Sequence, residues 1–306
     1  GERNIAVGRD ALGADTKGNY STAIGDATLS TQNFTSDTNV YNTAVGYQAG
    51  TAVTTGIQNV IIGGNAGNAL TDADKNIAIG VDALGAATKS NYSVAIGHDA
   101  LAAQNHTTST NSYNIGLGSQ AGQTITTGTN IICIGHSSDP SAVDGTNQIA
   151  IGKDVTCVGN SNFTFGAGGT DSNIQMGATS ISAPSDIRLK EDIEDETVGL
   201  EFINELRPVT FRWKKAKDVP SEMKAHSDSE ERVMNGKYNH GFIAQEVKET
   251  IDKYDIKDGF GMWVEDEADG RQRIAEGELM SILVKALQEL SAKNDALEAR
   301  IKTLEG

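Results

Sequence analysis

The sequence predicts a mainly β fibre of parallel β-roll coils, followed by an α+β domain that ends in a coiled coil. Three observations predict this fold: a short motif that recurs at regular spacing, a change of composition near residue 180, and a heptad pattern after residue 280. We expect four segments: a repetitive β-roll over residues 1–178, a linker over 179–184, an α+β domain over 185–275 and a coiled coil over 276–306.

The first segment is built from repeats. Its unit, as in Asn4-Ile-Ala-Val-Gly8, ends in a glycine, and these glycines follow one another at intervals of 17 or 21 residues. They are Gly8, Gly25, Gly46, Gly63, Gly80, Gly97, Gly118, Gly135 and Gly152. Residues 4–75 also match residues 76–147 at an offset of 72, which indicates a larger duplication. Such repeats are typical of stacked units, none of which can bury its apolar face alone.

Large and small side chains alternate before each glycine. The first and third positions before it are aliphatic and the second is small, as in Ile77-Ala78-Ile79. This period of two predicts a short strand with two different faces. We expect the large side chains to fill a narrow core and the small ones to allow a neighbouring backbone to approach. Because Cys133 and Cys157 take the small position, we interpret both as core residues rather than reactive thiols.

The stack needs partners along its length, because aromatic residues make up only 5% of the chain and one roll has little to bury. A parallel homotrimer would supply them. The two longest inserts lie around residues 26–41 and 98–113, where Phe34 or His106 stands among Asn, Ser and Thr. These inserts either contact a receptor or are plain surface loops.

The second half is charged, and both halves are acidic. Residues 1–184 hold 6 Lys and Arg against 13 Asp and Glu, and the whole chain has a net charge of -16. Such a chain repels nucleic acid and anionic membranes. The basic cluster at Lys214, Lys215 and Lys217 is interpreted as a solvated face. We expect no metal or other cofactor, no nucleic-acid partner and no membrane insertion.

The C-terminal segment has the pattern of a coiled coil. One heptad position holds leucine throughout and the other is apolar with one asparagine. The expected trimerisation residues are Leu283, Leu287, Leu290, Asn294, Leu297, Ile301 and Leu304, with Met280 beginning the second row. Asn294 either specifies register and strand number or is a stray polar residue in the seam.

Two resemblances extend this interpretation. The repeats resemble the β-roll heads of trimeric autotransporter adhesins over about residues 4–160, although these units are longer. From Ser185 onward the chain resembles the endosialidase-type intramolecular chaperone, a self-cleaving domain of phage tailspikes and tail fibres. The motifs that carry the second resemblance are Ser185-Asp-Ile-Arg-Leu-Lys190, Gly199-Leu-Glu-Phe-Ile-Asn-Glu-Leu-Arg-Pro208, Thr210-Phe-Arg-Trp213 and His240-Gly-Phe-Ile-Ala-Gln-Glu-Val247.

This resemblance implies an autoproteolytic serine peptidase with a Ser–Lys dyad. Ser185 would be the nucleophile and Lys190 the general base, since a serine hydroxyl reacts only once a base takes its proton. Cleavage is expected beside Ser185, most simply at the Pro184–Ser185 bond. In the alternative interpretation, Ser185 and Asp186 merely cap a turn.

Five further residues are candidates for a supporting role. Asp186 and Arg188 lie between the predicted nucleophile and base. Gln245 and Glu246 either lie near the site or form the charged end of an amphipathic helix. His240 is interpreted as structural rather than catalytic.

The implied protein is the distal part of a trimeric tail fibre or tailspike, assembled in the host cytoplasm and carried on the virion. Its chaperone domain would direct trimerisation and folding and then be released. The expected partners are two further copies of the chain and a host cell-surface receptor, either a glycan or an outer-surface protein. The alternatives are an adhesin-like structural protein and a capped fibre without cleavage. A polysaccharide-cleaving enzyme would need a carboxylate pair, and the repeats hold only scattered acids.

Overall fold

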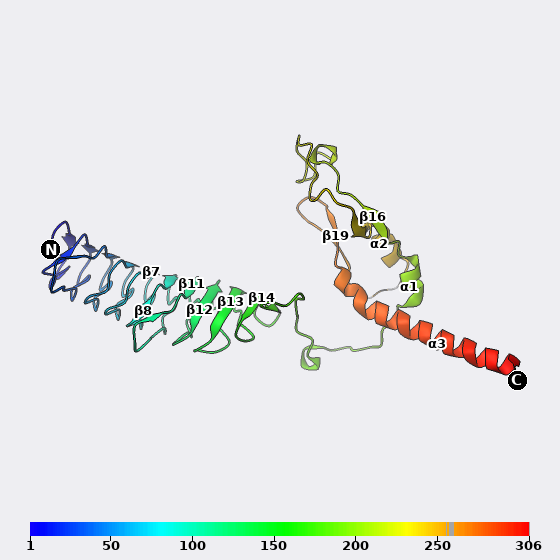
Figure 1. Cartoon of the computed structure of the whole chain (residues 1–306), viewed down its shortest axis with the longest axis horizontal. Coiled ribbons are helices and arrows are strands. Elements are labelled where there is room, and N and C mark those ends of the chain that lie inside the picture. Colours follow the sequence, from blue (N-terminus) through cyan, green and yellow to red (C-terminus); the bar gives the residue numbers. More distant parts are fainter. Residues whose placement is uncertain (255, 257–259, 306) are drawn as a thin grey trace. The chain divides into compact units, whose positions relative to one another are not determined.

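The computed structural model describes residues 1–254, 256 and 260–305, and the chain divides into two compact units, Gly1–Leu189 and Lys190–Gly306. The first unit is a stack of short coils (Figure 1). The second unit combines small antiparallel sheets with helices. The finer boundaries expected at residues 178, 184 and 275 stay a prediction.

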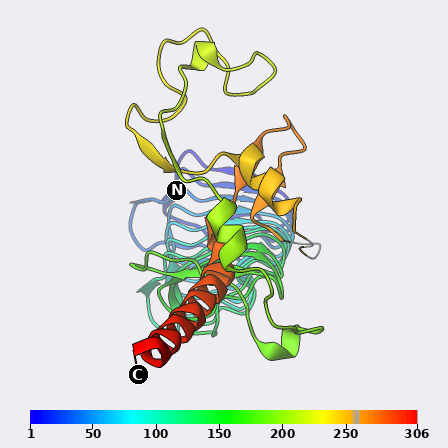
Figure 2. The same ribbon diagram turned by 90° about the vertical axis from the view of Figure 1, so that its right-hand side faces the viewer.

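One wall of the first unit is a sheet of 11 strands in the order β1-β3-β5-β6-β7-β9-β11-β12-β13-β14-β15. All neighbouring pairs are parallel except the last, β14 with β15, which is antiparallel. Viewed from the end, the coils lie one behind another (Figure 2). The predicted parallel β-solenoid is therefore confirmed. The strands are β1 (Ile5–Val7), β3 (Thr22–Ile24), β5 (Thr43–Val45), β6 (Val60–Ile62), β7 (Ile77–Ile79), β9 (Val94–Ile96), β11 (Ile115–Leu117), β12 (Thr129–Ile134), β13 (Thr146–Lys153), β14 (Asn162–Ala167) and β15 (Ser172–Gln175).

The expected assignment of large and small residues to the two faces of the sheet is wrong. The small middle residue of the strand points into the coil and is fully buried at Ala23, Ala78 and Ala95, whereas Ile24, directly after Ala23, is 40% exposed. The reason is that leucines from the return leg already fill the interior. These and similar buried residues are Leu29, Leu70, Leu84, Leu101 and Ile125.

In the coil at β6, glycines make room for a larger side chain at the middle position of the strand. Ile61 replaces alanine at the middle position and is fully buried. Two glycines make room for it, because a Cβ on Gly50 would lie 2.8 Å from Ile61 Cδ1 and one on Gly67 would lie 3.4 Å from Ile61 Cγ2. Close packing thus holds in the narrow core even where one side chain is larger.

A buried asparagine ladder links consecutive coils. The side-chain oxygen of Asn42 accepts from the backbone N–H of Asn59 at 2.9 Å, and that of Asn59 accepts from Asn76 at 2.9 Å. Each asparagine amide also donates to the preceding one, at 3.3 and 3.2 Å. The first residue of the repeat motif therefore satisfies a backbone donor that would otherwise be unpaired inside the stack.

Both cysteines are buried in the first unit, as predicted. Burial raises the pKa of the Cys133 thiol and of the Cys157 thiol. Because the reactive species is the thiolate, neither residue has the surroundings of a reactive thiol.

Each of the two long inserts contributes a strand to a small parallel sheet beside the main sheet. The first insert supplies β4 (Thr38–Asn39), which pairs with β2 (Gly18–Asn19) ahead of the insert, and the second supplies β10 (Thr110–Asn111), which pairs with β8 (Ser90–Asn91). The same arrangement at both sites agrees with the internal duplication.

The second unit is held by a small core of its own. Phe202, Val247, Met262, Leu279 and Ile282 are buried together, and the ring of Phe202 makes edge contacts with Tyr254 and Phe260. The elements after the solenoid are η1 (Ile187–Leu189), α1 (Leu200–Glu205), β16 (Val209–Phe211), η2 (Ala216–Asp218), β17 (Asn239–Gly241), α2 (Ala244–Ile251), β18 (Trp263–Glu265), β19 (Gln272–Ile274), η3 (Glu276–Glu278) and α3 (Leu279–Glu305).

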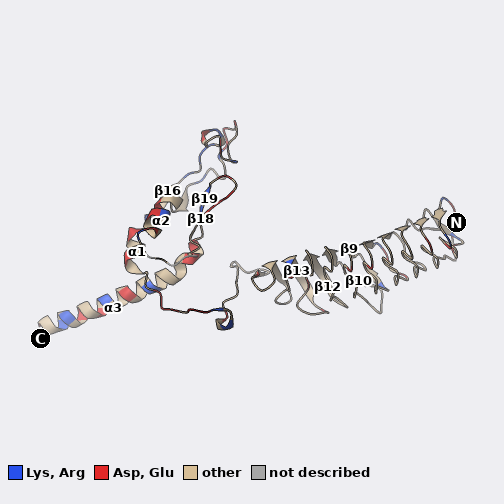
Figure 3. Cartoon of the chain, turned by 180° about the vertical axis from the view of Figure 1, so that it is seen from behind, with Lys and Arg blue, Asp and Glu red and all other residues tan. Residues whose placement is uncertain are grey.

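Helix α3 has one buried face and one exposed apolar face. Leu279, Ile282 and Ala286 are buried, and Glu289 accepts from the backbone N–H of Leu200 at 3.0 Å. The predicted seam residues all lie on the exposed part of the helix, and acidic and basic residues are interspersed along it (Figure 3). Among the described residues, no helix is both long and apolar enough to cross a membrane.

Replacing Gly97 by alanine is expected to destabilise the solenoid, whereas Gly64→Ala is not. Gly97 has φ +138°, and a Cβ there would lie 2.3 Å from the carbonyl oxygen of Gly118 on the next coil. A Cβ on Gly64 would meet nothing within 4 Å. We expect Gly97→Ala to cost about 2 kcal/mol or more, measured by denaturant unfolding. Equal stability of the two variants would contradict this account.

Candidate functional site

The two predicted dyad residues belong to different compact units of the chain. Ser185 belongs to the last residues of the first unit and Lys190 is the first residue of the second. Both side chains are exposed, as is Pro184. General-base lysines are desolvated where they work. The dyad therefore stays a prediction, and its chemistry requires that Lys190 become covered.

Between these two residues, Asp186 and Arg188 form a two-pronged ion pair. Arg188 Nε donates to Asp186 Oδ1 at 3.0 Å and Arg188 Nη2 donates to Asp186 Oδ2 at 2.6 Å, while the Arg188 backbone N–H donates to Oδ1 at 2.9 Å. These bonds from Arg188 lower the pKa of Asp186. Since both side chains are exposed, the pair adds little to stability. It holds the backbone in the short turn of η1.

Apolar side chains around this turn are also exposed. Ile187, Leu189 and Ile193 show 72%, 68% and 63% of their surface. Ile187 and Leu189 belong to the first unit and Ile193 to the second.

The remaining supporting candidates lie in the second unit. His240 is an exposed residue of β17, where it pairs with Thr210 of β16. Gln245 is exposed on α2. Glu246 accepts from Arg207 Nε at 2.9 Å and also pairs with Arg207 Nη2. The bonds from Arg207 lower the pKa of Glu246.

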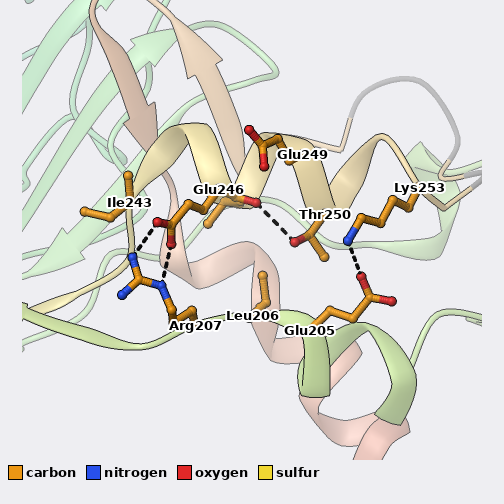
Figure 4. Close-up of a pocket in the computed structure, with 9 residues that line it drawn as sticks. Glu205, Leu206, Arg207, Ile243, Glu246, Glu249, Thr250 and Lys253 are labelled. Atoms are coloured by element: carbon orange, nitrogen blue, oxygen red, sulfur yellow. Dashed lines mark hydrogen bonds and ion pairs between the residues drawn. The ribbon is translucent and has the colours of Figure 1, made fainter.

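A pocket of about 230 Å³ lies between the end of α1 and helix α2 (Figure 4). Two ion pairs cross it: Arg207 with Glu246, and Lys253 Nζ with Glu205 Oε2 at 2.8 Å. Its lining residues are Glu205, Leu206, Arg207, Ile243, Glu246, Val247, Glu249, Thr250 and Lys253. Because Arg207 and Lys253 are paired with Glu246 and Glu205, these side chains are suited to holding α2 against the end of α1 rather than to acid–base chemistry.

Sequence reasoning named Glu246 but missed its partner. Arg207 stands 39 residues earlier, at the end of a quoted motif. Helical or strand spacing carries no signal for a pair so far apart. Lys253 and Glu205 were missed for the same reason.

A possible metal-ligand group lies in the first unit, where Asp82, His98 and Asp99 have ligand atoms within 4.8 Å of one another. His98 Nδ1 is already 3.0 Å from Asp99 Oδ2. The His98 imidazole and the Asp99 carboxylate thus contact each other directly. We therefore assign no ion to this group, and the expected lack of a metal stays a prediction.

Residues 185–256 match the family described as chaperone of endosialidase. The match begins at Ser185, directly after the last part of the solenoid. No curated protein and no solved structure matches the chain. The family match and the β-solenoid together fit a tail fibre that carries an endosialidase-type chaperone domain.

Replacing Arg207 by glutamine is expected to change how the second unit responds to acid. A lowered pKa of Glu246 gives stability that is present above the ordinary glutamate pKa and lost as pH falls through the folded pKa. As pH falls from about 5 to about 3, the thermal midpoint of the Arg207→Gln variant should therefore decrease less steeply than that of wild type.

The matched control is Arg212→Gln, because Arg212 donates to the backbone carbonyl of Gly236 instead. Melting curves followed by the fluorescence of Trp213 and Trp263 would measure the effect. Identical pH profiles for wild type and Arg207→Gln would show that the pair does not govern this titration.

Proposed function

We propose that this chain is the distal part of a trimeric tail fibre or tailspike for host attachment, assembled in the host cytoplasm and carried on the virion. Its C-terminal chaperone domain directs assembly and is then released by a cut beside Ser185. The observation that carries the proposal is the chaperone-of-endosialidase match, which begins at Ser185 behind a parallel β-solenoid. That family implies an autoproteolytic chaperone activity.

Two apolar surfaces without a partner in the single chain support self-association. The first, here called the sheet face, consists of the outward residues of the strands, and its exposed members include Ile5, Val7, Ile24, Ile62, Leu117 and Ile151. The second is the exposed seam of α3, with Leu287, Leu290, Leu297, Ile301 and Leu304. Both are continuous over several strands or turns. Parallel copies of the chain would cover both at once, and the number three comes from the resemblance.

The order of assembly follows from the kinds of contact involved. Parallel strands that pair between coils and between chains are slow to form, because each contact closes a long loop. Coiled-coil formation by α3 needs only local helix formation and side-chain contact. Helix α3 therefore gathers three chains and aligns their ends, and pairing then proceeds along the solenoid.

Cleavage would proceed through an ester. Ser185 Oγ attacks the carbonyl carbon of Pro184 while Lys190 takes the hydroxyl proton. The Pro184–Ser185 peptide bond breaks, its nitrogen receives a proton, and water then hydrolyses the ester. Because Lys190 is exposed in the single chain, this chemistry waits for a neighbouring chain to exclude water from the amine. The same exposure favours the alternative, a fibre that keeps its chaperone domain uncut.

The dyad is tested on a denaturing gel of the purified trimer. Wild type is expected to separate into residues 1–184 and 185–306, whereas Ser185→Ala and Lys190→Ala remain whole, because each removes a group that the reaction needs. Ser180→Ala serves as the control and is expected to cleave normally. If trimeric wild type remains whole, the cleavage proposal is wrong, and the protein is a fibre that keeps its chaperone domain.

The sheet face is tested by placing a charge on it. Leu117→Lys would bring three ammonium groups into an apolar seam, at a cost on the order of 2 kcal/mol per chain, and should lower the thermal midpoint and favour smaller species. Ser119→Lys, also exposed and on the same coil, is the matched control. Light scattering coupled to gel filtration gives the mass. If both variants behave like wild type, the sheet face is not the contact between chains.

A further inference from the structure

Two pairs of adjacent tyrosines lie on the corners of the solenoid. Tyr20 stacks on Tyr41 with ring centroids 5.1 Å apart, and Tyr92 contacts Tyr113 at 5.3 Å with the two rings tilted by 30°. We call them tyrosine patch 1 and tyrosine patch 2. Tyr41 and Tyr113 each expose 50% of their surface. Neither pair therefore exists to fill the core.

The backbone does not call for tyrosine at these corners either. All four residues have a left-handed backbone, with φ between 50° and 63°. Asparagine adopts this conformation at lower cost than most residues. In the same column of corners, Asn130 and Asn147 do so with φ 57° and 54°. The backbone conformation therefore does not explain why tyrosine occupies the four corners of the two patches.

The internal duplication keeps the patches but not a nearby exposed tyrosine. The offset of 72 relates Tyr20 to Tyr92 and Tyr41 to Tyr113. By contrast, Tyr47, which is 56% exposed, is related to Ser119. The two tyrosine pairs thus recur as units, whereas an isolated surface tyrosine does not.

A basic residue fixes the first ring of each patch. The Arg3 guanidinium lies 5.3 Å from the ring centre of Tyr20 and the Lys75 ammonium lies 4.8 Å from that of Tyr92. Lys75 Nζ also donates to the Tyr92 hydroxyl at 2.7 Å, and Arg3 donates to that of Tyr20. These positions are again related by the offset of 72. The rings are therefore held in place before any partner arrives, which lowers the entropy cost of binding.

The patches are local, unlike the sheet face. The corners between and after them carry polar residues, including Gln58 and Asn147. A contact between chains would need an apolar column along the whole stack, as the column of the sheet face that runs from Val7 to Ile151 provides. Instead, the two tyrosines of each patch lie at either end of one long insert. Tyr20 and Tyr92 precede the inserts, and β4 and β10 end two residues before Tyr41 and Tyr113. This placement fits a discrete ligand site.

The inserts offer neutral hydrogen-bonding groups. Residues 26–41 contain two charged side chains, Asp26 and Asp37, and residues 98–113 contain one, Asp99. Their other polar side chains are amides and hydroxyls, apart from His98 and the buried His106. In patch 2, Asn91 Nδ2 donates to Asn111 Oδ1 at 3.3 Å, and Asn111 Nδ2 donates to the Tyr113 hydroxyl at 3.4 Å. Aromatic rings beside amides and hydroxyls suit a sugar, whose C–H groups pack on rings while its hydroxyls take the hydrogen bonds.

We propose that the two tyrosine patches are paired binding sites for one neutral polysaccharide. The inference rests on the proposed host attachment and names the class of receptor and the residues that contact it. Tyr20 and Tyr92 are four coils apart, which at the usual strand spacing is about 19 Å. Two equal sites at a fixed separation match a ligand that repeats, because one chain can occupy both and gain from the effective concentration of the second contact.

The experiment measures binding of the intact protein to immobilised dextran, mannan and galactan, with polygalacturonate as the acidic probe. Wild type should bind at least one neutral polysaccharide. Tyr41→Ala and Tyr113→Ala should each weaken that binding by about tenfold or more, because one of two linked contacts is lost. The double variant should not bind. Tyr47→Ala, an exposed tyrosine outside the patches, should bind as wild type does.

Adhesion to a panel of bacterial strains, measured in parallel, separates this inference from the proposed function. Wild type that adheres to cells but binds no neutral polysaccharide, or binds polygalacturonate alone, overturns the inference and leaves host attachment standing. So does equal binding by wild type and the double variant. If the double variant dissociates into single chains, the patches are contacts between chains and the inference is wrong. Lack of both adhesion and polysaccharide binding would count against host attachment itself.

Discussion

The first unit depends on how closely neighbouring coils approach at one column of glycines. A Cβ on Gly8 would lie 2.3 Å from the carbonyl oxygen of Gly25, and the same conflict recurs along the column to Gly152. These glycines have φ between +117° and +140°, a region that side chains exclude. Successive coils are therefore separated by one strand spacing along the stack, and corresponding residues of successive repeats lie in columns. Every other feature of the stack follows from this alignment.

Alignment turns a repeated sequence into columns with separate tasks. Inside, the small residues meet leucines from the return leg, and the asparagine ladder satisfies backbone donors between coils. Outside, the aliphatic columns form a surface that a single chain leaves uncovered. The thin core and the apolar outer face have the same cause, since a coil of 17 residues encloses too little volume to hold the outward aliphatic residues of the strands as well as the leucines of the return leg. In the proposed trimer, partner chains would therefore add to the stability of the stack.

The position of Ser185 suits a cut that leaves both parts folded. The solenoid core ends before it, and the second unit has its own core around Phe202 and Met262. Removing the second unit would take away the helix proposed to align the chains, while the described core of the stack consists of residues of the first unit alone. After release, the fibre would persist because unfolding is slow, not because the lost domain could re-form it.

The sequence alone determined the repeat, its parallel stacking, the burial of Cys133 and Cys157 and the heptad seam, because each depends on spacing within a short stretch of chain. The family match at residues 185–256 agrees with motifs that were legible in the same way. Only the tertiary structure decided which face of each strand is inside, since a period of two separates the faces without saying which one meets the leucines of the return leg. The pairing of Arg207 with Glu246 and the stacking of Tyr20 on Tyr41 were likewise invisible, because both join residues that chain folding alone brings together.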